Sequence, residues 1–168
     1  MKTYLTYQEL SEMNACKEAL SSFKTIFGKK ATIKRVVYRL QNPGEKDKYA
    51  EDYERWLGWL IGQTQKLTIA LLKAGADIHT CRDYALRWAV ESSHTEMVKI
   101  LLKAGADVRT GNDEALCLAI GSGHTEMVKI LLEAGADIHT GNDYALRLAE
   151  AYGYTEMVEL LKSKGAKS

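Results

Sequence analysis

This 168-residue sequence contains a single proline, no spaced pair of cysteines and no long apolar run. Its three cysteines, Cys16, Cys81 and Cys117, form no spaced pair, so we expect a reducing compartment and no disulfide framework. No stretch approaches about 18 uninterrupted apolar residues, so we expect no membrane-spanning helix. The opening residues MKTYLTYQEL lack the apolar segment of a secretory signal, and we therefore predict a cytoplasmic protein.

The sequence also lacks the short motifs by which many enzymes are recognised. It has no glycine-rich phosphate loop, no HExxH zinc motif and no GxSxG nucleophile motif. Cys117 is a candidate nucleophile by residue type, but the sequence places no base beside it. The adjacent carboxylates Asp113 and Glu114 are better interpreted as caps of a helix. We therefore predict a protein that is not an enzyme and needs no cofactor.

Charge is unevenly shared along a chain whose net charge is +1. Residues 1–50 contain ten Lys and Arg against five Asp and Glu, whereas residues 51–168 contain thirteen against seventeen. The two parts therefore carry +5 and −4. This asymmetry predicts an N-terminal helical module at 1–50 and a second domain at 51–168.

The second domain contains a repeated phrase. Gly-Ala-Asp recurs at 75–77, 105–107 and 135–137, so the period is thirty residues. A period of this length is typical of a solenoid built from stacked units. In one unit the apolar residues fall on two helical faces, Ala85, Leu86, Ala89 and Val90 on the first and Met97, Val98, Leu101 and Leu102 on the second. We expect Asp83, Asp113 and Asp143 to be N-caps of the first helices, and Gly105 to end a second helix.

The phrase GHTEMVKILLEAGADI at 123–138 resembles the ankyrin repeat, whose usual text runs G-H-x-E-V-V-K-L-L-L-x-x-G-A-D-V-N. The resemblance is clear over about 75–166 and implies an all-α helical solenoid of about four repeats. Their approximate bounds are 52–77, 78–107, 108–137 and 138–168. It also implies non-catalytic protein binding through a concave surface of loops and first helices.

Two features depart from the family pattern. The period is thirty residues where the family has about 33. The usual T-P-L-H opening is replaced by Tyr84-Ala85-Leu86-Arg87, and the single proline, Pro43, lies outside the repeats. The missing residues fall between His139 and Tyr144, so we expect a shortened loop in place of the family's β-hairpin finger.

The first and last copies are the most divergent. Residues 52–74 are interpreted as a divergent first repeat, in which Trp56 and Trp59 replace small or aliphatic residues. In the last copy Glu150, Lys162 and Lys164 stand where the preceding copy has apolar residues. Polar substitutions of this kind are typical of a terminal capping repeat.

The N-terminal module is predicted to contain three helices. Thr6 and Glu9 form a capping-box pattern, a second helix runs to Gly28, and Thr32 precedes a third helix. We expect the module to dock on the first repeat through Trp56 and Trp59. The stretch NACKEALSSFKTIFG, with the later WLGWL, is similar to an N-terminal helical segment of phage and bacterial proteins of unassigned role.

Variation between copies is concentrated in one half of the repeat. Between 75–104 and 105–134 eleven of thirty positions differ, and ten of the eleven lie in 78–93. Positions 84, 87, 88 and 91, with their equivalents thirty and sixty residues later, follow one face of the first helix, and we name them the helix stripe. We expect position 88 to face a neighbouring layer and the others to face outward. The candidate partner-binding residues are His79, Arg82, Tyr84, Arg87, Glu91, Arg109, Asn112, Glu114, Cys117, His139, Asn142, Tyr144 and Arg147.

Two alternatives stay open beside a plain protein-binding module. The N-terminal similarity suggests a phage or bacterial inhibitor that sequesters a host protein, for example a defence protein. A basic run makes nucleic-acid binding the other alternative; its residues are Lys24, Lys29, Lys30, Lys34, Arg35 and Arg39. We expect a protein partner rather than nucleic acid, because few aromatic residues lie among these basic ones and Phe27 and Tyr38 should be partly buried. The four histidines are interpreted as structural and not as metal ligands, because those on successive repeats do not converge. The chain is expected to be a monomer or a homodimer.

Overall fold

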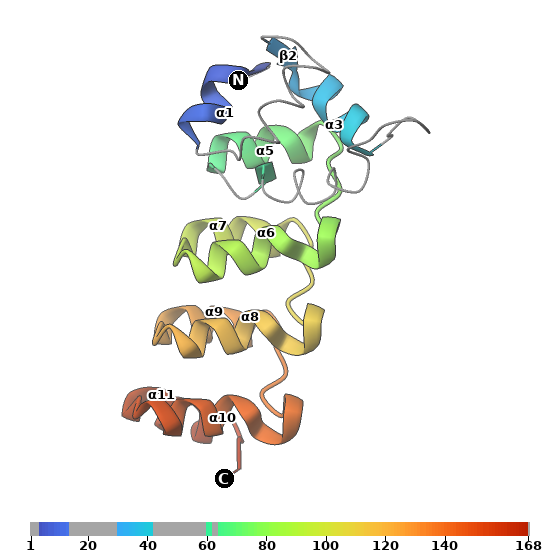
Figure 1. Cartoon of the computed structure of the whole chain (residues 1–168). Coiled ribbons are helices and arrows are strands. Elements are labelled where there is room, and N and C mark those ends of the chain that lie inside the picture. Colours follow the sequence, from blue (N-terminus) through green and yellow to red (C-terminus); the bar gives the residue numbers. More distant parts are fainter. Residues whose placement is uncertain (1–3, 14–29, 42–59, 62–63, 168) are drawn as a thin grey trace. The chain divides into compact units, whose positions relative to one another are not determined.

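The computed structural model describes residues 4–13, 30–41, 60–61 and 64–167 (Figure 1). Helices make up most of the described residues, so the chain has the predicted all-α fold class. It divides into two compact units, Met1–Cys81 and Arg82–Ser168. The predicted first repeat at 52–77 falls within the first unit. The predicted domain boundary near residue 50 lies outside the described residues.

The first unit begins with a capped helix. Helix α1, Tyr7–Glu12, follows strand β1, Tyr4–Thr6. The amide of Glu9 donates to Thr6 Oγ1 at 3.2 Å, and the amide of Thr6 donates to Glu9 Oε2 at 2.9 Å. These reciprocal bonds satisfy two amides that the helix itself leaves without acceptors. The predicted capping box is confirmed.

Two short strands in this unit were not predicted. Strand β1 pairs antiparallel with β2, Lys30–Thr32, so that Leu5 lies opposite Ala31. Both of these side chains are buried. Strands of three residues are too short to show the alternation of apolar and polar residues by which a strand is recognised.

Helix α3, Ile33–Gln41, follows β2 directly and is amphipathic. The amide of Arg35 donates to Thr32 Oγ1 at 3.2 Å, which supports the predicted role of Thr32 at the start of this helix. Ile33, Val36 and Val37 are buried. Tyr38 is 68% exposed, so the expectation that it is partly buried was wrong. The predicted second helix and the docking residues Trp56 and Trp59 lie outside the described residues.

Helix α5, Gln65–Lys73, corresponds to the second helix of the divergent first repeat. Its N-cap is Thr64, whose hydroxyl accepts the amide of Leu67 at 3.2 Å. Leu67 and Leu71 are fully buried, and so is Ile61. The repeat pattern therefore identified this helix correctly, although residues 52–59 of the same predicted repeat lie outside the described part.

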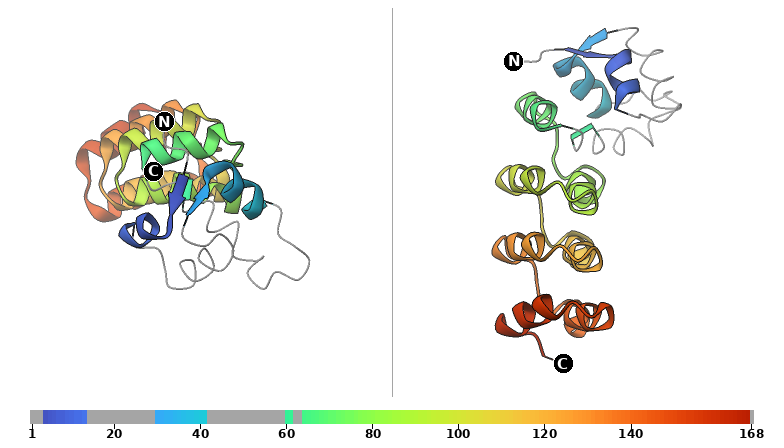
Figure 2. Two further views of the ribbon diagram at one scale, coloured as in Figure 1. Left: turned by 90° about the horizontal axis from the view of Figure 1, so that it is seen from above. Right: turned by 90° about the vertical axis from the view of Figure 1, so that its left-hand side faces the viewer.

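The second unit is a stack of helix pairs. The pairs are α6 (Thr80–Glu91) with α7 (Thr95–Lys103), α8 (Thr110–Gly121) with α9 (Thr125–Glu133), and α10 (Thr140–Tyr152) with α11 (Thr155–Ser163). Figure 2 shows the pairs as successive layers of similar orientation. The predicted apolar faces fill the space between them, with Leu101, Leu131 and Leu161 fully buried. Helical periodicity therefore identified the core of this unit.

Each second helix ends at a glycine. Gly105 has φ +99° and its amide donates to the carbonyl of Leu102 at 3.1 Å. The next amide, that of Ala106, reaches back to the carbonyl of Leu101 at 3.0 Å. These two bonds form a Schellman motif, in which a left-handed residue closes the helix end. Gly75, Gly135 and Gly165 adopt the same conformation, so the predicted glycine stop is confirmed in every copy described.

The last repeat carries the polar residues expected of a cap. Lys162 Nζ lies 2.9 Å from Glu150 Oε1, and Lys164 is exposed. These positions are apolar in the preceding copy, where Ile120 is buried, Leu132 is half-buried and Ala134 is exposed. The substitutions make the outer surface of α10 and α11 compatible with water.

Candidate functional site

A left-handed turn replaces the hairpin finger expected of longer repeats. Gly111, Asn112 and Asp113 have φ of 67°, 63° and 58°, and their equivalents at 141–143 repeat this conformation. Glycine, asparagine and aspartate are the residues that tolerate this region best. No strand occurs between residues 64 and 167. The predicted shortened loop therefore takes the form of a turn that leads directly into the right-handed part of the first helix.

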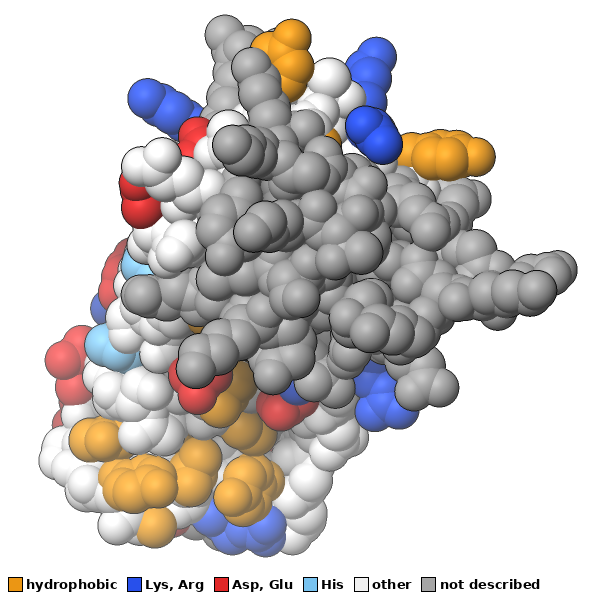
Figure 3. All heavy atoms as spheres, turned by 45° about the horizontal axis from the view of Figure 1, so that its top comes forward, with side chains coloured by type: hydrophobic (Ala, Val, Ile, Leu, Met, Phe, Trp, Pro, Cys, Tyr) orange, Lys and Arg blue, Asp and Glu red, His pale blue; other side chains and the backbone are white. Residues whose placement is uncertain are grey.

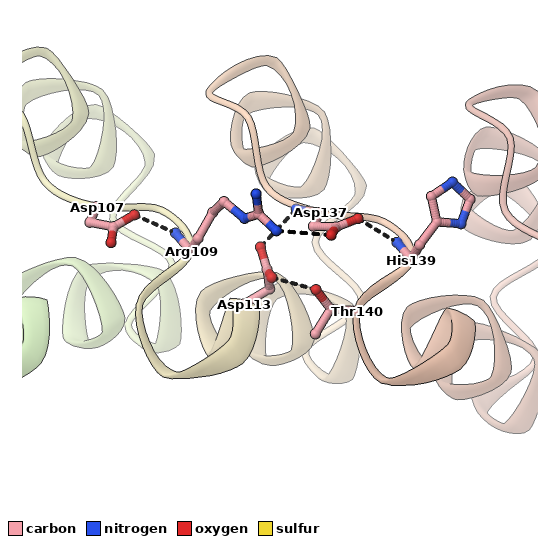
Figure 4. A network of polar contacts seen from close by, with 6 residues as sticks. All are labelled: Asp107, Arg109, Asp113, Asp137, His139 and Thr140. Carbon is pink, nitrogen blue, oxygen red and sulfur yellow. Dashed lines mark hydrogen bonds and ion pairs between the residues drawn. The ribbon is translucent and has the colours of Figure 1, made fainter.

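A buried aspartate in this turn joins one repeat to the next. Asp113 Oδ1 accepts the amide of Asp137 at 2.7 Å, and Asp113 Oδ2 accepts the hydroxyl of Thr140 at 2.5 Å (Figure 4). Asp83 makes the same two bonds one repeat earlier, to Asp107 at 3.0 Å and to Thr110 at 2.9 Å. Asp83 and Asp113 are each only 3% exposed.

The role predicted for these aspartates was therefore wrong. Asp113 does stand where the right-handed helix begins, as an N-cap would. Its two carboxylate oxygens, however, accept donors from the following repeat. A buried carboxylate is costly unless hydrogen bonds compensate for its lost hydration, and here each oxygen has a donor. The carboxylate thus fixes the spacing of neighbouring repeats.

A second set of aspartates orients the exposed loop residues. Asp107 Oδ1 accepts the amide of Arg109, and Asp137 Oδ1 accepts the amide of His139, both at 2.9 Å (Figure 4). Asp137 Oδ2 also accepts the guanidinium of Arg109 at 2.9 Å. His139 Nδ1 lies 2.8 Å from Asp143 Oδ1. Two of the predicted partner-binding residues are therefore held in place before any partner arrives.

In α6 and α8 the residues of the helix stripe make contacts between repeats. Arg87 lies 2.9 Å from Glu114 of the next repeat and 5.7 Å from the ring centroid of Tyr84. All three side chains are half-buried. The expectation that they face outward was therefore only partly right. Trp88 stacks on His94 of its own repeat at 5.2 Å, which was not predicted.

In α10 the residues of the helix stripe are more exposed to solvent. Tyr144 is 45% exposed, and the Arg147 guanidinium lies 5.9 Å from its ring centroid. Arg147 also donates to the carbonyl of Gly141 at 3.2 Å, and it forms no ion pair with a described residue. The same residue types thus serve an inter-repeat contact in α6 and an open surface in α10.

Cys117 occupies the stripe in the middle repeat and is half-buried. Burial raises the pKa of its thiol, and the negative charges of Asp113 and Glu114 raise it further. A raised pKa leaves less thiolate at neutral pH, and the thiolate is the nucleophilic form. Cys117 therefore lacks the environment of an activated nucleophile.

The remaining predicted residues are distributed between the two units. In the repeats His79, Arg82, Glu91, Asn112 and Asn142 are exposed. In the basic run Lys34 and Arg35 are exposed on α3, and Lys30 and Arg39 lie in β2 and α3. Lys24 and Lys29 lie outside the described residues.

Sequence reasoning missed an aromatic pair at the end of α10. Tyr152 and Tyr154 are stacked with their ring centroids 5.6 Å apart, and Tyr152 is 57% exposed. The replacement by Tyr154 of the histidine that the other copies carry at 94 and 124 was a visible signal. Within the described residues no group of three His, Cys, Asp or Glu side chains is placed to hold a metal ion. None of the helices described is long and apolar enough to cross a membrane.

Stacked helix pairs joined by short turns define a helical repeat scaffold. The family model for ankyrin repeats matches residues 59–142 and 113–168, and these matches together span more than half of the sequence. The chain belongs to the ankyrin-repeat family. No curated protein sequence matches it significantly. Ankyrin repeats generally mediate protein–protein interaction and are typically non-catalytic. The similarity of the N-terminal segment to phage and bacterial proteins, and the inhibitor role that it suggests, stay predictions.

Replacing Asp113 with Asn tests the link between repeats. Asn tolerates the left-handed conformation but loses the charge, so we expect the free energy of unfolding to fall by about 1–2 kcal/mol. The matched control is Asp143→Asn, because Asp143 stands at the same position but bonds only His139 among the described residues. In this control the free energy of unfolding should fall by less than about 1 kcal/mol. Urea unfolding followed by circular dichroism measures both, and equal losses would contradict the assignment.

Proposed function

We propose that the repeats bind a protein partner through the helix stripe, with Tyr144 and Arg147 of α10 at the centre of the contact. The observation that carries this proposal is the exposed tyrosine with an arginine held over its ring. Tyrosine and arginine are the residue types most enriched at the centres of protein interfaces. The remaining candidate residues of the stripe and loops would form the margin of the contact.

Preorganisation supports this choice. The hydrogen bond to Gly141 and the ring of Tyr144 restrain the Arg147 side chain before binding. Ordering a flexible side chain at an interface costs about 0.5–1.5 kcal/mol, so a restrained arginine loses less. The buried aspartates also hold the neighbouring turns in place. A rigid surface of this kind suits recognition without a large change of shape.

The surroundings of the pair indicate the chemistry of the partner. Tyr144, Leu148 and Tyr152 recur every four residues, so they follow one side of α10. Tyr144 and Tyr152 are the large hydrophobic side chains most exposed in the described part of the second unit. Figure 3 shows hydrophobic side chains gathered at the lower end of the molecule, with Lys or Arg beside them. We infer a partner that presents an apolar residue next to a carboxylate.

Replacing Tyr144 and Arg147 together with Ala should abolish capture of the partner, because the contact loses its aromatic ring and its charge. Both side chains are exposed, so the melting temperature should change by no more than about 2–4 °C. The partner is first identified by pull-down and mass spectrometry, and its affinity for purified variants is then measured. The expected loss is at least about ten-fold.

The matched control replaces Lys103 and Glu133, which are exposed at the ends of α7 and α9, with Ala. It should leave the affinity unchanged. An equal loss in the control, or full affinity in the Tyr144 and Arg147 variant, would reject the proposed surface. A second copy of the chain captured as the only partner would redirect the proposal to a homodimer.

A second candidate function is nucleic-acid binding by α3, and the exposure of Tyr38 favours it. Lys34 and Arg35 are exposed on the same helix, and Tyr38 lies one turn beyond Lys34. An exposed aromatic ring among basic side chains suits single-stranded nucleic acid, because a base stacked on such a ring contributes about 1–3 kcal/mol. The described part of this helix contains no acidic residue.

Replacing Lys34 and Arg35 with Glu tests this candidate. Binding of a single-stranded oligothymidine of about 20 nucleotides is measured by anisotropy at low and at physiological salt. We expect binding at low salt that the double variant weakens by at least about ten-fold. The control is Lys66→Glu with Lys73→Glu on α5, which makes the same change of charge at exposed positions. Absence of binding at low salt, or equal loss in the control, would remove this candidate.

A further inference from the structure

Aromatic and imidazole side chains line the edge of the second unit where each first helix turns into the second. We call this line the turn edge and define it by Trp88, His94, His124, Tyr152 and Tyr154. Trp88 stacks on His94 within one repeat, and Tyr152 stacks on Tyr154 within another. The turn edge shares Trp88 with the helix stripe and includes Tyr152, two turns beyond Tyr144 on α10, but it excludes the centre of the stripe at Tyr144 and Arg147.

Contacts between repeats make the turn edge continuous. The Ser93 hydroxyl is hydrogen-bonded to His124 Nε2, which joins the first two turns. The Tyr154 hydroxyl lies 3.4 Å from the carbonyl of Gly121, which joins the next two. The Tyr154 ring also lies against Gly123, where an added Cβ would meet it at 3.2 Å. Three separate turns therefore present one row of rings.

The charge along this row is mostly negative. Residues 88–99, 118–129 and 148–159, which surround the three turns, contain six Glu, two Lys and no Arg. Lys99 is paired with Glu96 at 2.9 Å and Lys129 with Glu156 at 4.0 Å. Lys162, which lies outside these ranges, is paired with Glu150 at 2.9 Å, so the acidic side chains still outnumber the basic ones. Glu91 and Glu126 are exposed and form no ion pair with described residues. Figure 3 shows histidine side chains next to acidic ones, above the hydrophobic group.

Two further observations agree with a negative potential here. A hydrogen bond from Lys99 to Glu96 raises the pKa of Lys99, and the charge of Glu126 raises it as well. The helix dipoles largely cancel at this edge, because the negative C-termini of α6, α8 and α10 lie beside the positive N-termini of α7, α9 and α11. The acidic side chains therefore decide the charge.

We propose that the turn edge is a second docking surface, which binds a basic protein segment rich in Arg or Lys. A cation over an aromatic face gains about 0.5–1 kcal/mol at an exposed site, and the row offers such faces at its two ends, Trp88 in one repeat and Tyr152 with Tyr154 in another. The exposed carboxylates of Glu91 and Glu126 complement the positive charge of such a segment. The same carboxylates disfavour nucleic acid and acidic peptides. Because the two aromatic groups lie two repeats apart, a segment that contacts both must be extended.

The test uses the full chain and a synthetic probe, acetyl-(Arg-Gly)5-amide, titrated by calorimetry in about 50 mM NaCl. The double variant Glu126→Gln with Tyr152→Ala should weaken binding by at least about ten-fold, because it removes one carboxylate and one exposed ring. Tyr152→Phe keeps the ring and should bind within about two-fold of the unmodified chain. The charge-reversed peptide acetyl-(Glu-Gly)5-amide should not bind.

Glu133→Gln is the matched control for charge, because Glu133 is exposed on α9 but lies two turns beyond Glu126, about 10 Å along the helix. It should change the affinity by less than about two-fold. Tyr144→Ala with Arg147→Ala should also leave peptide binding intact, which separates this proposal from that for the helix stripe. No heat of binding at low salt, or equal loss with Glu133→Gln, would overturn the proposal.

Discussion

The buried carboxylate of Asp113 is the interaction on which the repeat stack depends. Its two oxygens accept an amide and a hydroxyl of the following repeat, and Asp83 does the same one repeat earlier. Removing those donors would leave a buried charge without compensation, which costs far more than a surface contact contributes. Neighbouring repeats are therefore coupled by an interaction that is satisfied only when both are folded and correctly spaced.

This link explains how a thirty-residue unit dispenses with the longer finger of its family. The left-handed turn brings the aspartate to the next repeat, and a second aspartate then orients the exposed loop residues Arg109 and His139. Two surfaces result from this rigid arrangement. The helix stripe presents Tyr144 and Arg147 on the face of α10, and the turn edge presents its rings among acidic side chains. Both surfaces are proposed to bind protein, with opposite preferences for charge.

The parts that sequence could predict are those governed by neighbours in the chain. Helical spacing identified the buried faces, the recurring glycine identified the helix stops, and Thr6 with Glu9 identified a capping box. The function of Asp113 could not be predicted in this way, because its donors come 24 and 27 residues later. The pairing of Arg87 with Glu114 and the β1–β2 pairing likewise join distant positions. Only the geometry of the stack shows that Arg87 is engaged while Arg147 is accessible.

Native-state hydrogen exchange of the Asp107 and Asp137 amides tests the central claim most directly. Both amides lie in the links between helices, where exchange is usually fast, yet each donates to a buried carboxylate. If the aspartate links hold the stack together, these two amides will be protected as strongly as the core amides of α7 and α9. If they exchange as fast as unprotected backbone amides, the carboxylates do not couple the repeats.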